Sequence, residues 1–384
     1  MKVAQLVLSS PAFDDAQIAP LRAIEPQFVL VFGAVPFFSD PAVSARLRSL
    51  LPGVKLLGCS TAGEIHGTVV GDGEAVLTAV HFAHARIGLA SSALTSVADS
   101  REAGRRVGAA LLAPDLAGIF VVAPGTNING SDLVEGLAAG AGSGVAITGG
   151  LAGDGTRFER TWTLGDGGCS DHEVVVLGFY GKEIAFGRGS YGGWKPFGPE
   201  RRVTRCEGNI LHELDGQPAL QVYEKYLGDY AGGLPASGLL FPFEMVGEGQ
   251  AHKGLIRTIL GVDRASGSLT LAGAIAPGGN LMLMHASTDG LVDGAEAAAN
   301  MARDPFPGIE PGLAILVSCV GRKLVMGERV DEEVDAVAGA LGGAPAISGF
   351  YSYGEIGPFA SGSSCQLHNQ TMTVTWLGER AAAP

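Results

Sequence analysis

Short apolar runs, each followed by a segment with helical periodicity, recur along this chain. The runs at 29–32, 119–122 and 314–317 consist of apolar side chains, which is typical of buried strands. After each run come a helix-like segment, a second apolar stretch and a glycine-rich turn. This order predicts a strand, helix, strand and Gly-turn unit that is used three times.

Other strand-like runs follow one another without an intervening helix. Residues 75–82 and 85–92 predict a β-hairpin, and residues 160–164 with 173–181 predict a matching one. Purely parallel winding is therefore not expected. The predicted class is α/β (α+β), with mixed β-sheets flanked by helices. The pattern of apolar and polar residues changes after a Gly- and Pro-rich stretch, which predicts two domains, 1–217 and 218–384.

The glycine-rich turns contain the first candidates for a ligand-binding site. The octapeptide GCSTAGEI at 58–65 returns as GFYSYGEI at 349–356. A weaker copy has Ala152, Gly153 and Asp154 where the first has Ala62, Gly63 and Glu64. A glycine at a strand end lets the backbone approach a ligand, and a neighbouring carboxylate can hold a cation or an ammonium group. We therefore expect the acidic residues of the three turns, at least two of them, to line one cavity. The alternative is that the glycines only turn the chain.

Composition narrows the function classes. The net charge is −13, so the surface should repel nucleic acid and anionic lipid. Five cysteines are an odd number and form no CxxC pair, which favours free thiols in a reducing cytoplasm. No signal peptide and no membrane span are expected. The prediction is a soluble, cytoplasmic protein.

Six ordered motifs resemble the FIST sensory proteins of bacteria and archaea. These motifs are GCSTAGEI, GGLAGD, SYGGWKPFGP followed by VTRCEGNILHELDG, PALQVYEKYLG, and GFYSYGEIGP with LHNQTMTV. The resemblance implies paired N-terminal and C-terminal FIST domains and a sensory module that binds a small molecule such as an amino acid. It also implies a signalling partner, such as a histidine kinase or a cyclase, because no output segment follows the last strand.

A zwitterionic ligand needs a carboxylate for its ammonium group, and hydroxyl or backbone donors for its own carboxylate. Asn127 and Asn129 are equally well explained as turn formers, and Tyr351 and Tyr353 as half-buried strand aromatics. The candidate ligand-binding residues are Cys59, Ser60, Thr61, Gly63, Glu64, Asn127, Asn129, Gly150, Asp154, Tyr351, Tyr353, Glu355, His368 and Asn369.

Two alternatives stay open. A haem-based nitric oxide sensor on the same scaffold would need an axial ligand, for which His66, His285 and His368 are available, although no motif singles one out. A cysteine-dependent enzyme would use Cys59 as its nucleophile. Arg322, which follows a buried strand, could clamp an anion or lie on the surface. No metal-site motif occurs, and no cofactor is expected unless the haem alternative holds.

Overall fold

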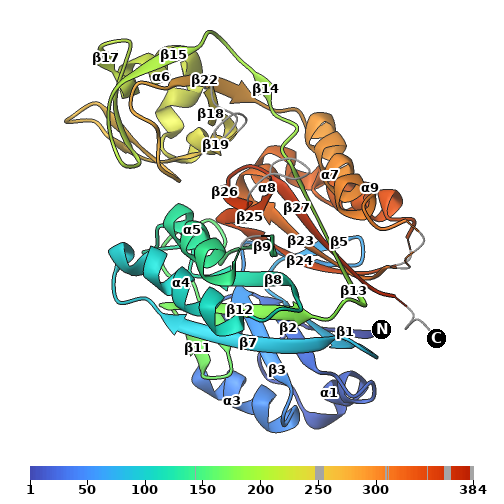
Figure 1. Cartoon of the computed structure of the whole chain (residues 1–384). Helices are drawn as coiled ribbons and strands as arrows, with labels where there is room; N and C mark the ends of the chain where they lie inside the picture. Colours follow the sequence, from blue (N-terminus) through green and yellow to red (C-terminus); the bar gives the residue numbers. More distant parts are fainter. Residues whose placement is uncertain are drawn as a thin grey trace.

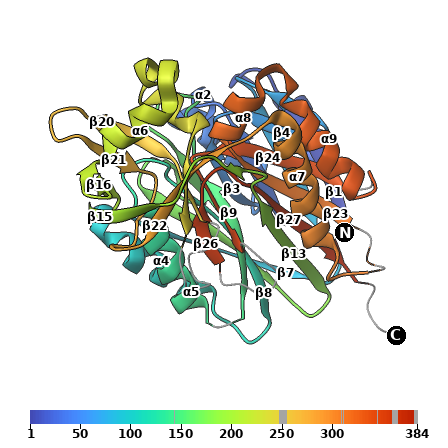
Figure 2. The same cartoon turned by 90° about the horizontal axis from the view of Figure 1, so that it is seen from above.

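The computed structural model describes residues 1–142, 144–246, 255–307, 309, 311–343, 345–358 and 365–380. A body of three six-stranded sheets carries a smaller layer, which has a sheet of its own and lies across one end of the body (Figure 1). Helices lie around the outside of the body (Figure 2). The expected mixed α/β fold is confirmed. None of the helices in the described ranges is long and apolar enough to cross a membrane.

The first sheet is built around a parallel pair, β2 and β3. The antiparallel strand β6 separates β2 from β1, and a hairpin of β10 and β11 extends the sheet beyond β3. Its order is β1 (Lys2–Leu8), β6 (Ala75–His81), β2 (Phe28–Gly33), β3 (Lys55–Ser60), β10 (Thr163–Gly165) and β11 (Gly168–Ser170).

The other two sheets of the body repeat this plan. The second has the order β7 (Arg86–Ala93), β12 (Glu173–Tyr180), β8 (Leu116–Ala123), β9 (Ala146–Leu151), β25 (Gly354–Pro358) and β26 (Cys365–His368). The third has the order β13 (Ile184–Tyr191), β27 (Met372–Glu379), β23 (Pro311–Cys319), β24 (Ala346–Ser352), β4 (Glu64–His66) and β5 (Val69–Gly71). In each sheet the last hairpin is supplied by a different part of the chain. The three units therefore exchange hairpins in a closed ring.

The same place in each parallel pair holds a glycine. A Cβ atom added to Gly58, Gly149 or Gly349 would lie 2.0, 1.9 or 2.1 Å from a carbonyl oxygen of the adjacent parallel strand. Such distances are far below van der Waals contact, so a side chain here would push the strands apart. Three of the many glycines are thus explained by close approach of strands.

Aromatic side chains from the three sheets meet in a shared core. Phe32 of β2, Phe120 of β8 and Phe350 of β24 are fully buried. The ring of Phe32 lies 4.7 Å from that of Phe350 and 6.4 Å from that of Phe120, measured between centroids. Because each ring comes from a different sheet, burial of this cluster couples the folding of all three units.

Each unit carries its own helices on the outside. In the second unit α4 and α5 pack so closely that a Cβ atom on Gly136 would lie 1.9 Å from the carbonyl oxygen of Arg101. The helices of the body are α1 (Asp15–Arg22), α2 (Pro36–Ser39), α3 (Pro41–Leu50), α4 (Ser100–Leu111), α5 (Gly130–Ala141), α7 (Thr288–Arg303), α8 (Val320–Met326) and α9 (Asp331–Ala340), with 3-10 turns at Val97–Asp99 and Gly327–Arg329.

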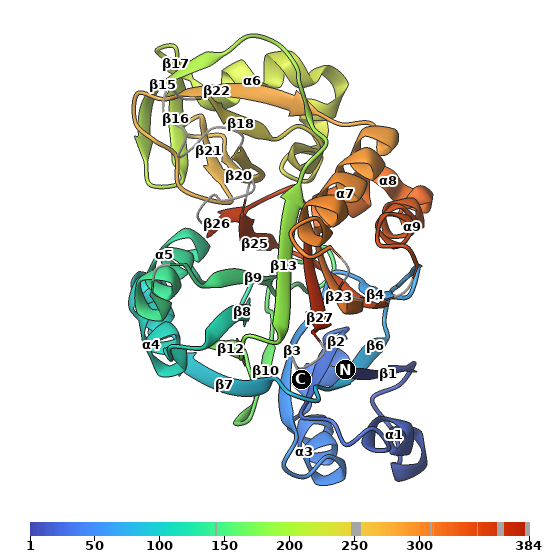
Figure 3. The same ribbon diagram turned by 45° about the vertical axis from the view of Figure 1, so that its right-hand side comes forward.

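The smaller layer is inserted between β13 and α7, and β13 runs from the body towards it (Figure 3). Its core includes Tyr223 and Phe243. Residue 217, at which the sequence predicts the domain boundary, lies within this layer. Strands that precede it pair with strands that follow it, β9 with β25 in the second sheet and β13 with β27 in the third. Its elements are β14 (Lys195–Pro196), β15 (Arg201–Glu207), β16 (Ile210–Leu214), β17 (Gln217–Pro218), α6 (Ala219–Leu227), 3-10 turns at Gly228–Gly233 and Ala236–Leu240, β18 (Phe243–Val246), β19 (Ile256–Arg257), β20 (Ile259–Asp263), β21 (Ser268–Leu271) and β22 (Asn280–His285).

The two hairpins predicted from adjacent strands are wrong. β6 belongs to the first sheet and β7 to the second, while β10 pairs with β3 and β11, not with β12. The short connections lead from one sheet into the next, because the three sheets enclose a common core. Local sequence proximity therefore does not give strand pairing here.

Candidate functional site

The three glycine-rich turns meet and bond to one another. Each turn donates a main-chain hydrogen bond to a neighbouring turn, which closes a ring of three contacts. These bonds run from Ala62 N to Tyr351 O at 2.8 Å, from Gly153 N to Ser60 O at 2.8 Å, and from Tyr353 N to Leu151 O at 3.2 Å. The three turns therefore hold one another in place and link the three sheets of the body.

This ring shows that the second copy was aligned one residue out of register. Gly153 occupies the place of Ala62 and Tyr353, whereas the sequence comparison had set it against Gly63. Gly63 has a φ of 140°, but Gly153 and Gly354 are not among the residues with positive φ. The three glycines of the signature are thus not equivalent.

The expectation that all three turns carry an equivalent acidic residue is also wrong. Strand pairing places Glu64 opposite Phe350, Glu355 opposite Gly150, and Thr163 opposite Cys59. The second unit thus has Thr163 where the other two have glutamate. The reason is a loop, 155–162, that separates the second turn from its hairpin strand. Asp154 lies before that loop and is not the counterpart of the glutamates.

Glu64 and Glu355 are buried at corresponding places. The hydroxyl of Thr61 donates to Glu64, and that of Ser352 donates to Glu355 over 2.5 Å. The N–H and hydroxyl of Thr371 both donate to the second oxygen of Glu355 over 3.1 Å. Burial raises the pKa of Glu64 to about 7 and that of Glu355 to about 8, against the lowering effect of these hydrogen bonds.

Asp154 is held more firmly in its charged form. It accepts from the hydroxyl of Tyr353 and from the main-chain N–H groups of residues 158–160 over 2.8–3.0 Å. Burial acts to raise its pKa, but these hydrogen bonds outweigh burial and lower it. Each of the three acids thus has hydrogen-bond donors from its own turn or loop, and Glu355 and Asp154 have donors from a second segment as well.

The remaining candidates have mostly structural surroundings. Ser60 donates to the carbonyl of Gly153 over 2.7 Å, and Tyr351 donates to Glu333 over 2.5 Å. Asn129 caps α5 by accepting from the N–H of Asp132 over 3.1 Å. The exposed Asn127 has a φ of 57° and forms a turn.

Three further candidates are His368 at the end of β26, Asn369 in the turn that joins β26 to β27, and Gly150 on β9. His368 and Asn369 are buried, and burial lowers the pKa of His368 to about 4, so that its ring is neutral. Gly150 packs against Val317. These residues do not line the main cavity.

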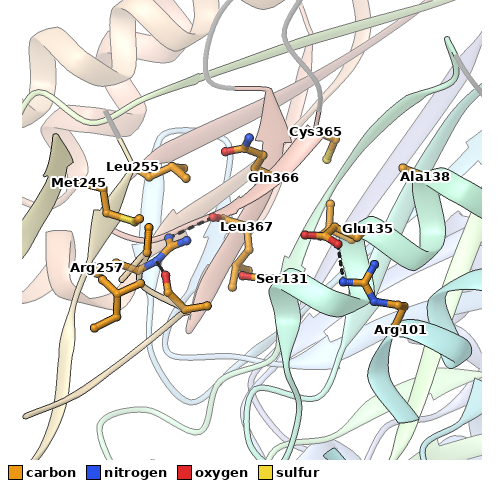
Figure 4. Close-up of a pocket in the computed structure, with 14 residues that line it drawn as sticks. Arg101, Ser131, Glu135, Ala138, Met245, Leu255, Arg257, Cys365, Gln366 and Leu367 are labelled. Carbon is orange, nitrogen blue, oxygen red and sulfur yellow. Dashed lines mark hydrogen bonds and ion pairs between the residues drawn. The ribbon is translucent and has the colours of Figure 1, made fainter. Parts of the chain in front are cut away.

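The main cavity lies between the second unit and the inserted layer, and has a volume of about 630 Å³ (Figure 4). One wall is a face of α5 together with β26, and the other comes from β18, β19 and the chain after β21. Neither Glu64 nor Glu355 takes part in it. Its lining residues are Arg101, Ser131, Val134, Glu135, Ala138, Met245, Leu255, Arg257, Ala274, Ile275, Ala276, Cys365, Gln366 and Leu367.

Two family models match the chain, the FIST N domain over residues 27–217 and the FIST C domain over residues 219–358. Together they cover most of its length. The chain belongs to the FIST family. FIST domains are sensory domains in signalling.

The relatives of this FIST protein add little about its ligand. It is 29% identical over 241 residues to an uncharacterised protein of Mycobacterium bovis and 27% identical over 243 residues to one of Mycobacterium tuberculosis. Each match covers 60% of both chains, so the chain spans about 60% of the length of these curated relatives. A crystal structure of cyanuric acid hydrolase from A. caulinodans aligns over 99% of both chains, with 12% identity and a TM-score of 0.35, too low to support an argument.

The three histidines available to the haem alternative do not line the cavity. Among its described lining residues there is no histidine or tyrosine, and only Met245 and Cys365 carry sulfur. His66, His285 and His368 lie elsewhere. No cluster of three His, Cys, Asp or Glu suited to a metal ion occurs in the described ranges.

Cys59 and Arg322 are both enclosed in the FIST body. Burial raises the pKa of the Cys59 thiol well above its usual value, which opposes the thiolate that a nucleophile requires. Arg322 is fully buried and bonds to Glu333 at 3.0 and 2.7 Å. It is neither a surface residue nor a free anion clamp.

The residue that sequence reasoning missed is Arg257. It is 4% exposed, lies on the short strand β19 and lines the cavity. Burial lowers the pKa of its guanidinium to about 10, which still leaves it charged at neutral pH. A lone arginine within the apolar sequence LIRTIL was the signal that could have pointed to it.

Proposed function

We propose that this FIST protein is a cytoplasmic sensory protein that binds a small polar metabolite, an amino acid or a similar compound, in the cavity between α5 and the inserted layer. The observation that carries this proposal is the position of the cavity. Its walls come from two layers of the molecule, so one bound molecule contacts both. The proposed binding site is therefore this cavity, whereas the sequence predicted a site at the glycine-rich turns.

A ligand in this place has a direct route to a signal. Contacts to α5 on one side and to β18 and β19 on the other stabilise one arrangement of the two layers relative to others. A change in the relative populations of these arrangements alters the outer surface that a partner would contact. We propose a signalling protein, such as a histidine kinase or a cyclase, as the partner.

The polar groups of the cavity suit a ligand with a polar head and a small apolar part. Glu135 forms an ion pair with Arg101 at the α4–α5 side. Ser131 places a hydroxyl nearer the centre, while Val134, Leu255 and other apolar side chains complete the walls.

Filling the cavity from α5 should abolish ligand binding. Ala138 lines the cavity, so Ala138→Trp would occupy ligand space, whereas Ala139→Trp on the exposed face of the same helix would not. The measurement is a thermal-shift screen of amino acids and small organic acids. A compound at 100 times its Kd should add about 2.7 kcal/mol of stability to the wild-type protein and to Ala139→Trp.

The same compound should leave the melting temperature of Ala138→Trp unchanged. A ligand-induced shift that persists in Ala138→Trp, or a screen in which no compound shifts the wild-type protein, would contradict the proposal.

A further inference from the structure

Arg257 is fixed in place by main-chain carbonyl groups. Its Nε donates to the carbonyl of Ala274 over 3.1 Å, and its Nη1 donates to that of Leu367 over 3.4 Å (Figure 4). Nη1 also donates to the carbonyl of Ile256 over 3.2 Å. These bonds join β19, the chain after β21 and β26. They leave Nη2 without an acceptor in the part of the chain that the structure describes.

The charge of Arg257 also lacks a counterion there. No carboxylate of the described residues lies within 4 Å of its guanidinium, in contrast to Arg322, which is also buried and pairs with Glu333. A buried cation is costly unless an anion compensates it, and carbonyl dipoles do so only in part. The lowered pKa of Arg257 reflects the same uncompensated burial.

We propose that Arg257 is the anchor for an anionic group of the ligand, and that this group is a carboxylate. The inference rests on the proposed function, since it assumes a ligand in the cavity. With Nε and Nη1 held by the protein, Nη2 can donate to an incoming oxygen without loss of the existing bonds. The guanidinium is thus oriented before the ligand arrives, which limits the entropy lost on binding.

A carboxylate fits the rest of the cavity better than a phosphate does. Glu135 at the α4–α5 side and the net charge of −13 oppose a multiply charged anion. The apolar walls from Met245, Leu255 and Leu367 instead suit a hydrocarbon portion. The expected ligand class is therefore a small carboxylic acid with an apolar part, to which an amino group near Glu135 can be added.

The experiment compares carboxylates with neutral molecules of nearly the same shape. The probes are butyrate and hexanoate, their primary amides butyramide and hexanamide, and inorganic phosphate, each titrated in a thermal-shift assay. The carboxylates should stabilise the wild-type protein, while the amides and phosphate should bind about 10- to 100-fold more weakly, as expected for loss of a charge-assisted hydrogen bond.

Two variants locate the effect at Arg257. Arg257→Met should lose the preference for carboxylates over amides and melt at or above the wild-type temperature without ligand, because a costly charge has been removed. Arg257→Lys keeps the charge but not the planar fork, so it should retain the preference with reduced affinity. If the methionine variant does not fold, the lysine variant alone decides the assignment.

The outcomes separate this inference from the proposed function. Equal binding of carboxylates and amides, abolished by Ala138→Trp, would overturn the role of Arg257 and leave the cavity as the ligand site. Stronger binding of phosphate than of the carboxylates would overturn the ligand class. Binding of all probes that is unaffected by Ala138→Trp would contradict the proposed function itself.

Discussion

Replacing Arg322 with methionine is expected to lower the free energy of unfolding by about 3–5 kcal/mol, because it leaves the carboxylate of Glu333 buried without its partner. Both side chains are fully buried, and Glu333 accepts from Nε and Nη2 of Arg322 at 3.0 and 2.7 Å. Arg322 also donates to the carbonyl of Leu291 over 2.8 Å. The variant therefore loses bonds that join α7, α8 and α9.

Chemical denaturation of Arg322→Met and Arg257→Met provides a matched comparison. Both changes remove a buried arginine, but only the first leaves a buried carboxylate behind. A large loss for Arg322→Met beside little or no loss for Arg257→Met is the predicted result. Equal losses would show that Arg257 is a structural brace of the same kind as Arg322.

Stability should fall as pH rises from about 5 to above 8, owing to Glu355 and Glu64. Their folded-state pKa values, about 8 and about 7, lie above the ordinary glutamate value of 4.5, so the folded protein holds protons that the unfolded chain releases. The stabilisation is complete below the unfolded pKa and is lost as pH rises through the folded pKa. For Glu355 the change is on the order of 3–5 kcal/mol.

Glu355→Gln tests this assignment. The amide can accept from the N–H of Thr371 and donate to the hydroxyl of Ser352, so the turn keeps its bonds while losing the titration. Urea unfolding from pH 5 to pH 9 should show a flatter profile for the variant, and greater stability than the wild-type protein at the alkaline end. An unchanged slope would mean that Glu355 does not carry the effect.

The general architecture followed from the sequence because it depends on local patterns. Apolar runs, helical periodicity and glycine-rich turns predicted the mixed sheets and the flanking helices, and Glu64 and Glu355 were correctly matched. The second copy was misaligned because the loop at 155–162 moves its hairpin strand away from its turn. The strand pairing was missed because hairpins exchanged between units depend on contacts distant in sequence.

The site could be predicted only in part for a related reason. A glycine followed by an acid resembles a binding turn, yet Glu64 accepts from Thr61 of its own turn, and Asp154 accepts from its own loop and from Tyr353 of the third turn. Whether such a group is free depends on neighbours that fold onto it. Arg257 stands apart in sequence from Glu135 and Leu367, and only the packing of the inserted layer on α5 brings them to one cavity.

Hydrogen exchange with and without the compound that gives the largest thermal shift tests the location of the site most directly. Bound ligand should slow exchange of amides in β19, in β26 and along α5, because opening of these elements would require its release. The amides of the turns at 60–64 and 351–355 should exchange at the same rate in both states. Slowed exchange confined to those turns, with β19, β26 and α5 unaffected, would contradict the account and place the ligand at the glycine-rich turns.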